Sequence, residues 1–588
     1  MITFLQNKKF WLVYLTLCFG IAPIFHGQEE QLINYYEVSN LNFIYGGSYT
    51  ELPSLEPLKE IQLSIGEKTF TISQVKAGAN ISNHFSLRQI QEISQLPIQY
   101  LKSKGYEGIV AFPHPNQIHP ISAKDLRDSN DKSLQIVVWV SHLQSVELQN
   151  LGVNNSLFGA FQRSSEEYFS AKGETSQPLI SEDLRFWKRY GSGNGRTSIT
   201  SLKPGNNPGD VIAVVKIGLK QKQGGSLYAS NAGTATTGKW ILGGSFSYNQ
   251  MSERDDDIQI SYLSSDTRER QAFNAKYSLP LMHPGILHLD LQAGYSSYDA
   301  SSFAITRIDF EGETRSLDVS LRWNPLHLEK DNYQVGLELG VKGEDVESEN
   351  SLISGRADVQ MLTPRIGVSL QTKGTYLKTM TKLQVRRNTQ DIQAFDRSLL
   401  GGVNAVDKST RLQLTYFESL KLGKWIRDHL DNDLPEFLDR QILLSRFSAD
   451  VGLENKRHLP QHQFISGGTG SVRGYPESPI AGDSGYFASI EYRMPVGAIE
   501  HLSSLGTLST TLIPFFDWAE TFTTDPLPYE SDKSIAGAGI GLEMKFSKGL
   551  QARVDFAKPL KEINNAGAIL DGTKSNDSRV HAMLVWKF

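Results

Sequence analysis

The sequence predicts an all-β transmembrane barrel of about 16 antiparallel strands, preceded by two small α+β domains. From about Gly224 onward, segments such as DIQISYLSS and YQVGLELGVKG alternate in period two between Asp/Asn/Gly/Ser-rich breaks. The chain ends in a strand, Val580–Phe588, with one apolar face and an aromatic end, which is typical of a barrel wall facing lipid. Hydrophobic residues make up only 39% of the chain, which excludes a bundle of apolar membrane helices but suits strands that turn alternate residues to lipid.

The strand-like region covers residues 223–588. Spanning strands of about 9–11 residues, with turns and longer loops, fit about 16 strands into this length. An even number of strands would place both ends of the barrel on the periplasmic side. A barrel of this size leaves a water-filled lumen, so some part of the chain must close it. The charged amphipathic insertion Lys421–Arg440 interrupts the pattern, and we expect it to lie outside the bilayer.

The N-terminus reads as a secretory signal peptide over residues 1–27. Two lysines precede the apolar run Phe10–Phe25, which a proline interrupts, and polar residues follow. We place the cleavage near Gly27, with a cut after Gly20 as the alternative. The single cysteine, Cys18, lies inside this segment, so the mature chain would contain no disulfide or thiolate site. Export combined with a strand-rich body indicates a Gram-negative outer membrane.

Two mixed segments separate the signal from the barrel. Residues 36–143 combine extended segments with a predicted helix at about Ser86–Lys104, which the following glycine would end. Residues 144–222 form a second unit, with a predicted helix over Ser181–Tyr190 and strands on either side. The sequence therefore predicts two small α+β domains and then a barrel over residues 223–588.

Composition and motif searches give no sign of catalysis. A formal net charge of −5 argues against nucleic-acid binding. The sequence GDSG at Gly482–Gly485 imitates a protease nucleophile loop, but no matching His and Asp segments precede it. The stretch Gly233–Trp240 imitates a phosphate-binding loop but has Trp240 in place of Ser or Thr. His114 and His119 lack the spacing and partners of a metal site. We expect no enzymatic activity, no cofactor and no metal.

The most informative loop is GGTGSVRGYPESPIAGDSG, Gly467–Gly485, which carries Arg473 among glycines and lies between two strand-like segments. Its glycines allow tight turns, and a guanidinium can hold one carboxylate through two parallel hydrogen bonds. On spacing alone, Arg473 is more simply a solvated loop charge worth at most about 1 kcal/mol. Further along, Phe515 and Asp517 are two residues apart, so both share one strand face. That face should be lumenal, because a carboxylate facing lipid is costly.

The order of these segments resembles the two-partner-secretion outer-membrane transporters, the haemolysin secretion/activation proteins of ShlB/FhaC/HecB type. The two small units resemble the POTRA (polypeptide-transport-associated) domains of that family. The resemblance extends over most of the mature chain and rests on these motifs, in this order: YLKSKGYEGIVAF (Tyr100–Phe112), LYASNAGTATTGKW (Leu227–Trp240), SVRGYPES (Ser471–Ser478), FFDWAE (Phe515–Glu520), RVDFAKPL (Arg553–Leu560) and the terminal Phe588.

The resemblance implies specific roles for a few residues. The lumenal loop motif is Val472, Arg473, Gly474 and Tyr475, and its arginine would meet the wall-motif carboxylate. The wall motif is Phe515, Asp517 and Ala519, where the family prefers glycine at the last position. Tyr475 would either stack within the plug or pack the base of the loop. At the C-terminus, Trp586 and Phe588 would form an interfacial girdle and an assembly signal.

Two departures from the family concern gating and client capture. Few residues separate the predicted signal from the first POTRA-like domain, so the N-terminal plug helix of some members is not expected here. The first POTRA-like domain is also longer than in the family.

The implied function is secretion, with possible activation, of a large unfolded exoprotein through the barrel. An exposed strand edge of a POTRA-like domain would capture this client by adding it as a strand. The expected partners are the secreted client, outer-membrane lipid and, during biogenesis, the barrel-assembly machinery, with no nucleic acid. Two alternatives stay open: an insertase that assembles other barrel proteins, and a passive porin or adhesion scaffold.

Overall fold

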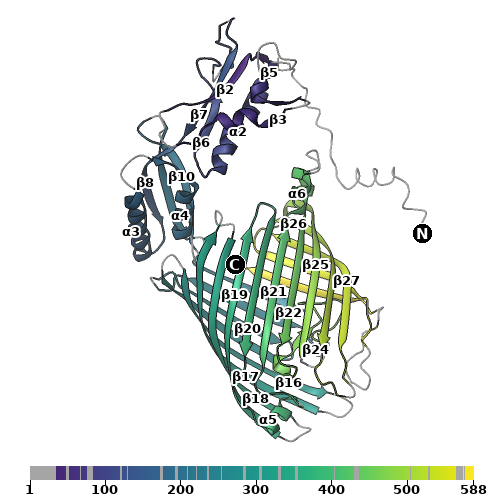
Figure 1. The fold of residues 1–588 in the computed structure, drawn as a ribbon. Coiled ribbons are helices and arrows are strands. Elements are labelled where there is room, and N and C mark those ends of the chain that lie inside the picture. Colours follow the sequence, from purple (N-terminus) through teal and green to yellow (C-terminus); the bar gives the residue numbers. More distant parts are fainter. Residues whose placement is uncertain are drawn as a thin grey trace, which may run out of the picture. The chain divides into compact units, whose positions relative to one another are not determined.

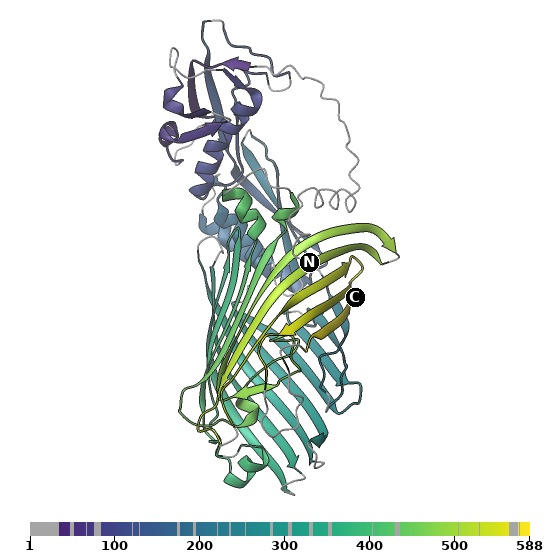
Figure 2. The same ribbon diagram turned by 90° about the vertical axis from the view of Figure 1, so that its right-hand side faces the viewer.

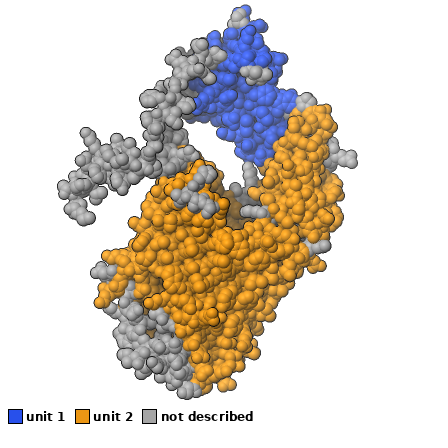
Figure 3. All heavy atoms as spheres, turned by 180° about the vertical axis from the view of Figure 1, so that it is seen from behind, with its two compact units in different colours: residues 1–141 blue, residues 142–588 orange. Residues whose placement is uncertain are grey.

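The computed structural model forms two compact units, residues 1–141 and residues 142–588, which Figure 3 colours separately. It describes residues 35–588 except for short internal segments, namely 48–51, 66–67, 76–83, 120–121, 129, 173–176, 192–195, 208, 220, 235–236, 253, 283–285, 304–307, 329–332, 351–354, 403, 430–435, 504, 528–529, 564–573 and 575–576. The predicted signal peptide with Cys18 lies outside the described residues. None of the described helices is long and apolar enough to cross a membrane.

The first unit is a small α+β fold in which one helix packs against a three-stranded sheet. The helix α2 (Leu87–Ser103) begins at Ser86, whose side chain and that of Gln89 cap each other's backbone N–H groups. The sheet has the order β2 (Asn40–Tyr45), β7 (Ser133–Val140), β6 (Ile109–Pro113). Two short pairs complete the unit: β1 (Tyr35–Glu37) with β5 (His84–Ser86), and β3 (Gln62–Ile65) with β4 (Lys68–Thr71). Its core is apolar and buried, as expected for a fold that stands alone.

The second unit begins with another α+β fold, whose sheet has the order β10-β11-β8-β9. Its strands are β8 (His142–Leu151), β9 (Gln177–Pro178), β10 (Arg196–Pro204) and β11 (Asp210–Leu219). Two helices cover the sheet, α3 (Asn155–Lys172) and α4 (Ser181–Gly191). Helix α4 was predicted from the sequence, whereas α3 was not; α3 buries Leu157 and Phe161 against Trp187 of α4 and the sheet.

A closed barrel of sixteen antiparallel strands follows in the described part of the chain, which confirms the predicted fold class (Figure 1). Around the wall its strands are β12 (Gln223–Ser230), β13 (Ile241–Asn249), β14 (Asp257–Ser265), β15 (Arg270–Met282), β16 (Leu287–Phe303), β17 (Ile308–Leu328), β18 (Tyr333–Asn350), β19 (Gly355–Lys373), β20 (Leu377–Arg387), β21 (Thr410–Leu420), β22 (Ile442–Gly452), β25 (Ser484–Ser503), β26 (Gly506–Phe522), β27 (Lys533–Phe546), β28 (Leu550–Pro559) and β29 (Arg579–Lys587).

The barrel closes where β12 pairs with β29 in antiparallel register, from Ser226↔Lys587 to Ser230↔Met583. Just beyond this register, Gly225 and Phe588 exchange two backbone hydrogen bonds of 3.0 Å. Closure leaves neither terminal strand with a free edge at these positions, as a membrane wall requires.

The wall alternates between a lipid-facing and a lumenal surface, as strand β19 illustrates. Leu362, Ile366 and Leu370 are exposed on the outer face, whereas Thr363 and Arg365 on the other face line a charged lumenal cavity. Because successive side chains of a strand point to opposite faces, the same period recurs around the wall. The outer surface is therefore apolar and the inner surface polar, which is the arrangement of a membrane-spanning barrel.

The two rims of the barrel differ in what they carry. We call the rim that holds the start of β12 and the end of β29 the proximal rim, and the opposite one the distal rim. The predicted insertion between β21 and β22 lies at the proximal rim, where it forms α6 (Leu422–His429) and α7 (Glu436–Asp439). The distal rim carries α5 (Ala394–Leu399), in the connection between β20 and β21.

Candidate functional site in the barrel lumen

The glycine-rich loop leaves the wall after β22 and returns to it at β25. Its base is a two-stranded pair, β23 (Phe464–Ser466) with β24 (Ile480–Gly482). Gly467 and Gly468 have φ of 117° and 89°, values that residues with a side chain rarely adopt. These turns reverse the chain tightly enough for the loop tip to reach the inner face of the wall.

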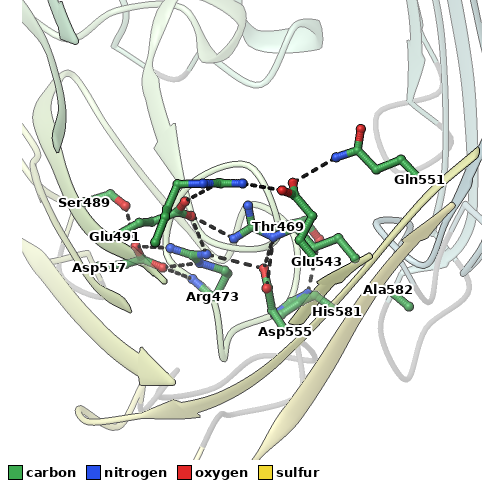
Figure 4. Close-up of polar contacts among 12 residues, drawn as sticks. Thr469, Arg473, Ser489, Glu491, Asp517, Glu543, Gln551, Asp555, His581 and Ala582 are labelled. Carbon is green, nitrogen blue, oxygen red and sulfur yellow. Dashed lines mark hydrogen bonds and ion pairs between the residues drawn. The ribbon is translucent and has the colours of Figure 1, made fainter. Parts of the chain in front are cut away.

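At the loop tip, Arg473 is bound to Asp517 of β26 (Figure 4). The guanidinium donates from Nε to Oδ2 at 2.7 Å and from Nη2 to Oδ1 at 2.8 Å, and the backbone N–H of Arg473 donates to Oδ2 at 3.1 Å. Asp517 is 0% exposed and Arg473 is 1% exposed, whereas Phe516 and Trp518 lie on the outer face of the same strand. The carboxylate is therefore lumenal, and the pair is a buried bidentate ion pair.

Three further wall residues complete the surroundings of this pair. Ser489 of β25 donates to Asp517 Oδ1 at 2.7 Å. Nη1 of Arg473 donates to Glu491 of β25 at 2.8 Å and to Asp555 of β28 at 3.3 Å. Burial alone would lower the pKa of the Arg473 guanidinium, but the hydrogen bond and the charge of Asp517, aided by Glu491 and Asp555, raise it, so the side chain remains cationic.

A second arginine balances the negative charge of the extra carboxylates around Arg473. Arg553 of β28 donates from Nη2 to Glu491 at 2.7 Å and from Nε to both oxygens of Asp555 at 3.0 Å. Glu491 also accepts a hydrogen bond from Arg493. Each of these carboxylates therefore has an arginine partner, and the loop arginine is one member of an ionic network that reaches β25, β26 and β28.

The other residues of the loop motif are held by packing and close backbone approach. Tyr475 is fully buried, and its hydroxyl lies 2.7 Å from the carbonyl oxygen of Lys561 and 2.9 Å from that of Ala536. These contacts tie the loop to β27 and to the chain that follows β28. Val472 is also buried, in a cluster that includes Ala519, and a methyl group fits at Ala519 where the family prefers glycine.

Two glycines and a histidine set how closely the loop meets the wall. Gly474 has φ of 95°, and a Cβ there would come within 2.9 Å of the backbone nitrogen of Pro559. A Cβ on Gly537 of β27 would overlap the carbonyl oxygen of Arg473. His581 of β29 accepts the Gly474 N–H at Nε2, at 3.1 Å, and its Nδ1 lies 3.1 Å from the hydroxyl of Thr469. Every strand from β25 to β29 therefore contributes to the seat of the loop.

The structure brings most of the predicted site residues together, with Phe515 under the guanidinium carbon of Arg473 at 3.5 Å from the ring centroid. Sequence reasoning missed Ser489, Glu491, Gly537 and His581, and it quoted Asp555 in a motif without giving it a role. Glu491 could have been found from its spacing. It lies two residues after Ser489 on the strand that follows the loop, so the two side chains share one strand face, as those of Phe515 and Asp517 do.

The predicted C-terminal pair lies elsewhere, on the outer face of the barrel. Trp586 and Phe588 are about half exposed, and their ring centroids are 5.5 Å apart. They sit at the proximal rim beside the β12–β29 closure, which is a suitable place for an interfacial aromatic pair.

A second, apolar contact lies in the distal part of the lumen. Ile392, Ala405 and the end of α5 pack against the inner face of β18 and β19, and Leu459 from the start of the loop after β22 inserts among them. The buried members of this cluster are Val346, Ala357, Val359, Met361, Ile392, Leu399, Leu400, Ala405 and Leu459. We call this cluster the distal cap.

A closed barrel with an inward-folded loop and small N-terminal α+β folds defines an outer-membrane barrel transporter. A model of the Omp85 superfamily domain matches residues 240–574, so the chain belongs to the Omp85 superfamily. A comparison with curated proteins found no match.

Among solved structures, the fold is similar to CdiB from Escherichia coli, with a TM-score of 0.59 at 14% identity, covering 96% of this chain and 93% of that one. CdiB from Acinetobacter baumannii gives a TM-score of 0.52 at 12% identity, covering 99% and 98%. BamA from Haemophilus ducreyi lacking POTRA domains 1–3 gives 0.51 at 13% identity, covering 94% and 100%. At these identities the likeness is one of fold.

Replacing Gly537 by alanine should unseat the loop, because its Cβ would overlap the Arg473 carbonyl. We expect the Gly537→Ala barrel to melt at lower temperature in a heat-modifiability gel and to become cleavable within the loop by added protease. Gly470→Ala is the matched control, since a Cβ at Gly470 meets nothing within 4 Å. Equal behaviour of the two variants would contradict the close approach.

Removing the charge of Arg473 should lower the stability of the folded barrel more than removing the charge of Asp517. Arg473→Ala leaves the buried Asp517 without its cation and leaves Glu491 and Asp555 to Arg553, whereas Asp517→Asn leaves the arginine with two other carboxylates. Breaking a buried pair costs about 3–5 kcal/mol. The measurement is thermal unfolding of purified barrels in detergent, with the double variant to obtain the coupling. A larger loss for Asp517→Asn would contradict this order.

Proposed function

We propose that this Omp85-superfamily barrel secretes a large, unfolded exoprotein across the outer membrane, and that its N-terminal α+β folds are POTRA-like domains that receive the client in the periplasm. No catalytic step is part of this proposal. The single observation that supports it most is an open strand edge beside a groove in the second of these folds, because a passive pore has no use for one. The fold likeness to the two CdiB structures supports the same choice.

The open edge belongs to β8. Within the described residues, β9 pairs only with His142 and Leu143, so the rest of β8 pairs on one side only, with β11. A cavity of about 780 Å³ lies between this edge and helix α3. Its lining includes Val146 and Leu148 of β8, and Phe158 and Phe169 of α3.

This geometry suits an extended polypeptide. A client strand can pair with the open edge through its backbone, while alternate side chains enter the groove between strand and helix. Backbone pairing makes little demand on sequence, which a carrier of a long, varied client requires. The apolar lining adds affinity for exposed hydrophobic side chains of an unfolded chain.

The lumen then conducts the client, and two contacts govern its passage. The Arg473 network fixes the loop against β25–β29, and the distal cap lies against the inner face of β18 and β19. We infer that the client displaces the cap, whose apolar contacts it can replace, and that the Arg473 loop positions the chain. Folding of the client outside the cell supplies the driving force.

An insertase that assembles other barrel proteins is the second candidate, because the fold is also similar to BamA. The two functions predict different losses from the cell. Deletion of the gene, followed by mass spectrometry of the culture supernatant and of the outer-membrane fraction, separates them.

We expect the deletion to remove one or two large proteins from the supernatant and to leave the outer-membrane proteome intact. Wild type should restore them, and Arg473→Ala at equal barrel abundance should not. A broad loss of barrel proteins would favour the insertase. No change in either fraction would favour a passive pore or scaffold.

Filling the groove should reduce secretion without affecting the barrel. Gln162 lines the groove, whereas the neighbouring Arg163 does not, and both are exposed on α3. Gln162→Trp should lower the rate of client appearance in the supernatant about tenfold if it weakens capture by about 1.4 kcal/mol. Arg163→Trp should secrete at the wild-type rate. Equal rates for the two variants would contradict capture in this groove.

A further inference from the structure

One strand of the barrel wall continues past its neighbour at the proximal rim. Strand β25 pairs with β22 from Asp450↔Gly485 to Ile442↔Arg493 and no further. On its other side, β25 pairs with β26 from Ser484↔Phe522 to Ser503↔Gly506. Among the described residues, Met494–Glu500 therefore have a strand partner on one side only. We call this segment the rim edge.

The rim edge projects from the wall instead of lying in it. Val496 is 51% exposed and Ile499 is 53% exposed, and the residues between them are also exposed, so both faces of the segment are open as well as one edge. In Figure 2 the yellow-green hairpin of β25 and β26 arches beyond the ends of the neighbouring strands. The segment reads MPVGAIE, with Glu500 as its single charge.

The open edge has a local cause. The chain that precedes β22 leaves the wall as α6 and α7, so β22 cannot extend to cover β25. The side chains of Gln441 and Tyr492 are hydrogen-bonded where the two strands part. An unpaired strand edge is not tolerated in hydrocarbon, so the rim edge belongs in water or against another extended chain.

We propose that the rim edge pairs with an extended segment of the client as it enters the barrel. This inference rests on the proposed secretion function and adds a docking site on the barrel itself, separate from β8. An edge of backbone N–H and C=O groups accepts a strand, and its nearly uncharged faces favour an apolar or neutral stretch. Pro495 and the bulge between Pro495 and Gly497 interrupt the edge, which limits pairing to a short segment that can be released.

We assign the client to the rim edge because β25 also carries residues of the Arg473 network. A few residues further along the same strand, Ser489 and Glu491 hold Asp517 and Arg473. A chain that pairs with the rim edge is therefore placed at the mouth of the lumen, next to the wall to which the loop is fixed.

The experiment places the photoreactive amino acid p-benzoyl-phenylalanine at Val496 in full-length protein in living cells. The partner sought in the cross-linked product is the exported protein that the gene deletion removes from the supernatant. Ile540 of β27 is the matched control, since it is 51% exposed but lies on the lipid-facing wall. We expect a cross-link between position 496 and the exported protein, and none from position 540.

Two proline variants test the backbone itself. Successive N–H groups of a strand point to opposite edges, so of Ala498→Pro and Ile499→Pro one removes a donor at the open edge and the other a donor to β26. The open-edge variant should lose both the cross-link and secretion while its heat stability stays at the wild-type value.

Each other outcome has one meaning. A cross-link only to lipid or to barrel-assembly proteins, or wild-type secretion by both proline variants, overturns the rim edge as a client site while secretion itself stands. If the deletion removes no exported protein, the proposed function fails first, and the inference fails with it.

Discussion

The bidentate pair between Arg473 and Asp517 is the interaction on which the lumen depends. A guanidinium at 1% exposure and a carboxylate at 0% exposure are tolerated only because each satisfies the other. That requirement explains much of the surrounding sequence. Ser489 donates a further hydrogen bond to Asp517, and Glu491 and Asp555 accept hydrogen bonds from Nη1 of Arg473. The loop cannot leave the wall without exposing these charges to one another.

Two contacts inside the barrel, one ionic and one apolar, fix connecting segments to the inner wall. The Arg473 network is polar and directional, so it specifies one position of the loop and is costly to disturb in part. The distal cap is apolar, so any chain with exposed hydrophobic side chains can compete for its surface. An unfolded client carries such side chains. In the proposed function, the cap is therefore the contact that the client displaces, and the ionic network is the fixed reference against which the client moves.

Sequence reasoning predicted the barrel because period-two alternation is local, as on β19 with Leu362 outside and Thr363 inside. The pairing of Arg473 with Asp517 came from a family motif. Glu491 and His581 were missed because their place depends on the stagger between strands, which single-strand patterns do not encode. Gly537 was missed because glycine is required there only by the close approach of the Arg473 carbonyl, which lies far away in the sequence. Helix α3 was missed because its apolar residues form two groups, one around Leu157–Phe161 and one at Tyr168 and Phe169, separated by a polar stretch.

Strand β25 joins the rim edge to the Arg473 network, and its geometry restricts how the two can communicate. A slip of β25 by one residue would turn Glu491 and Ser489 toward lipid, which their charge and hydrogen bonds forbid. The paired part of the strand is thus fixed in register. The bulge between Pro495 and Gly497 separates this part from the exposed end and raises the local twist. The proposed docking at the rim edge would therefore bend the hairpin about the bulge and leave the ionic network in place.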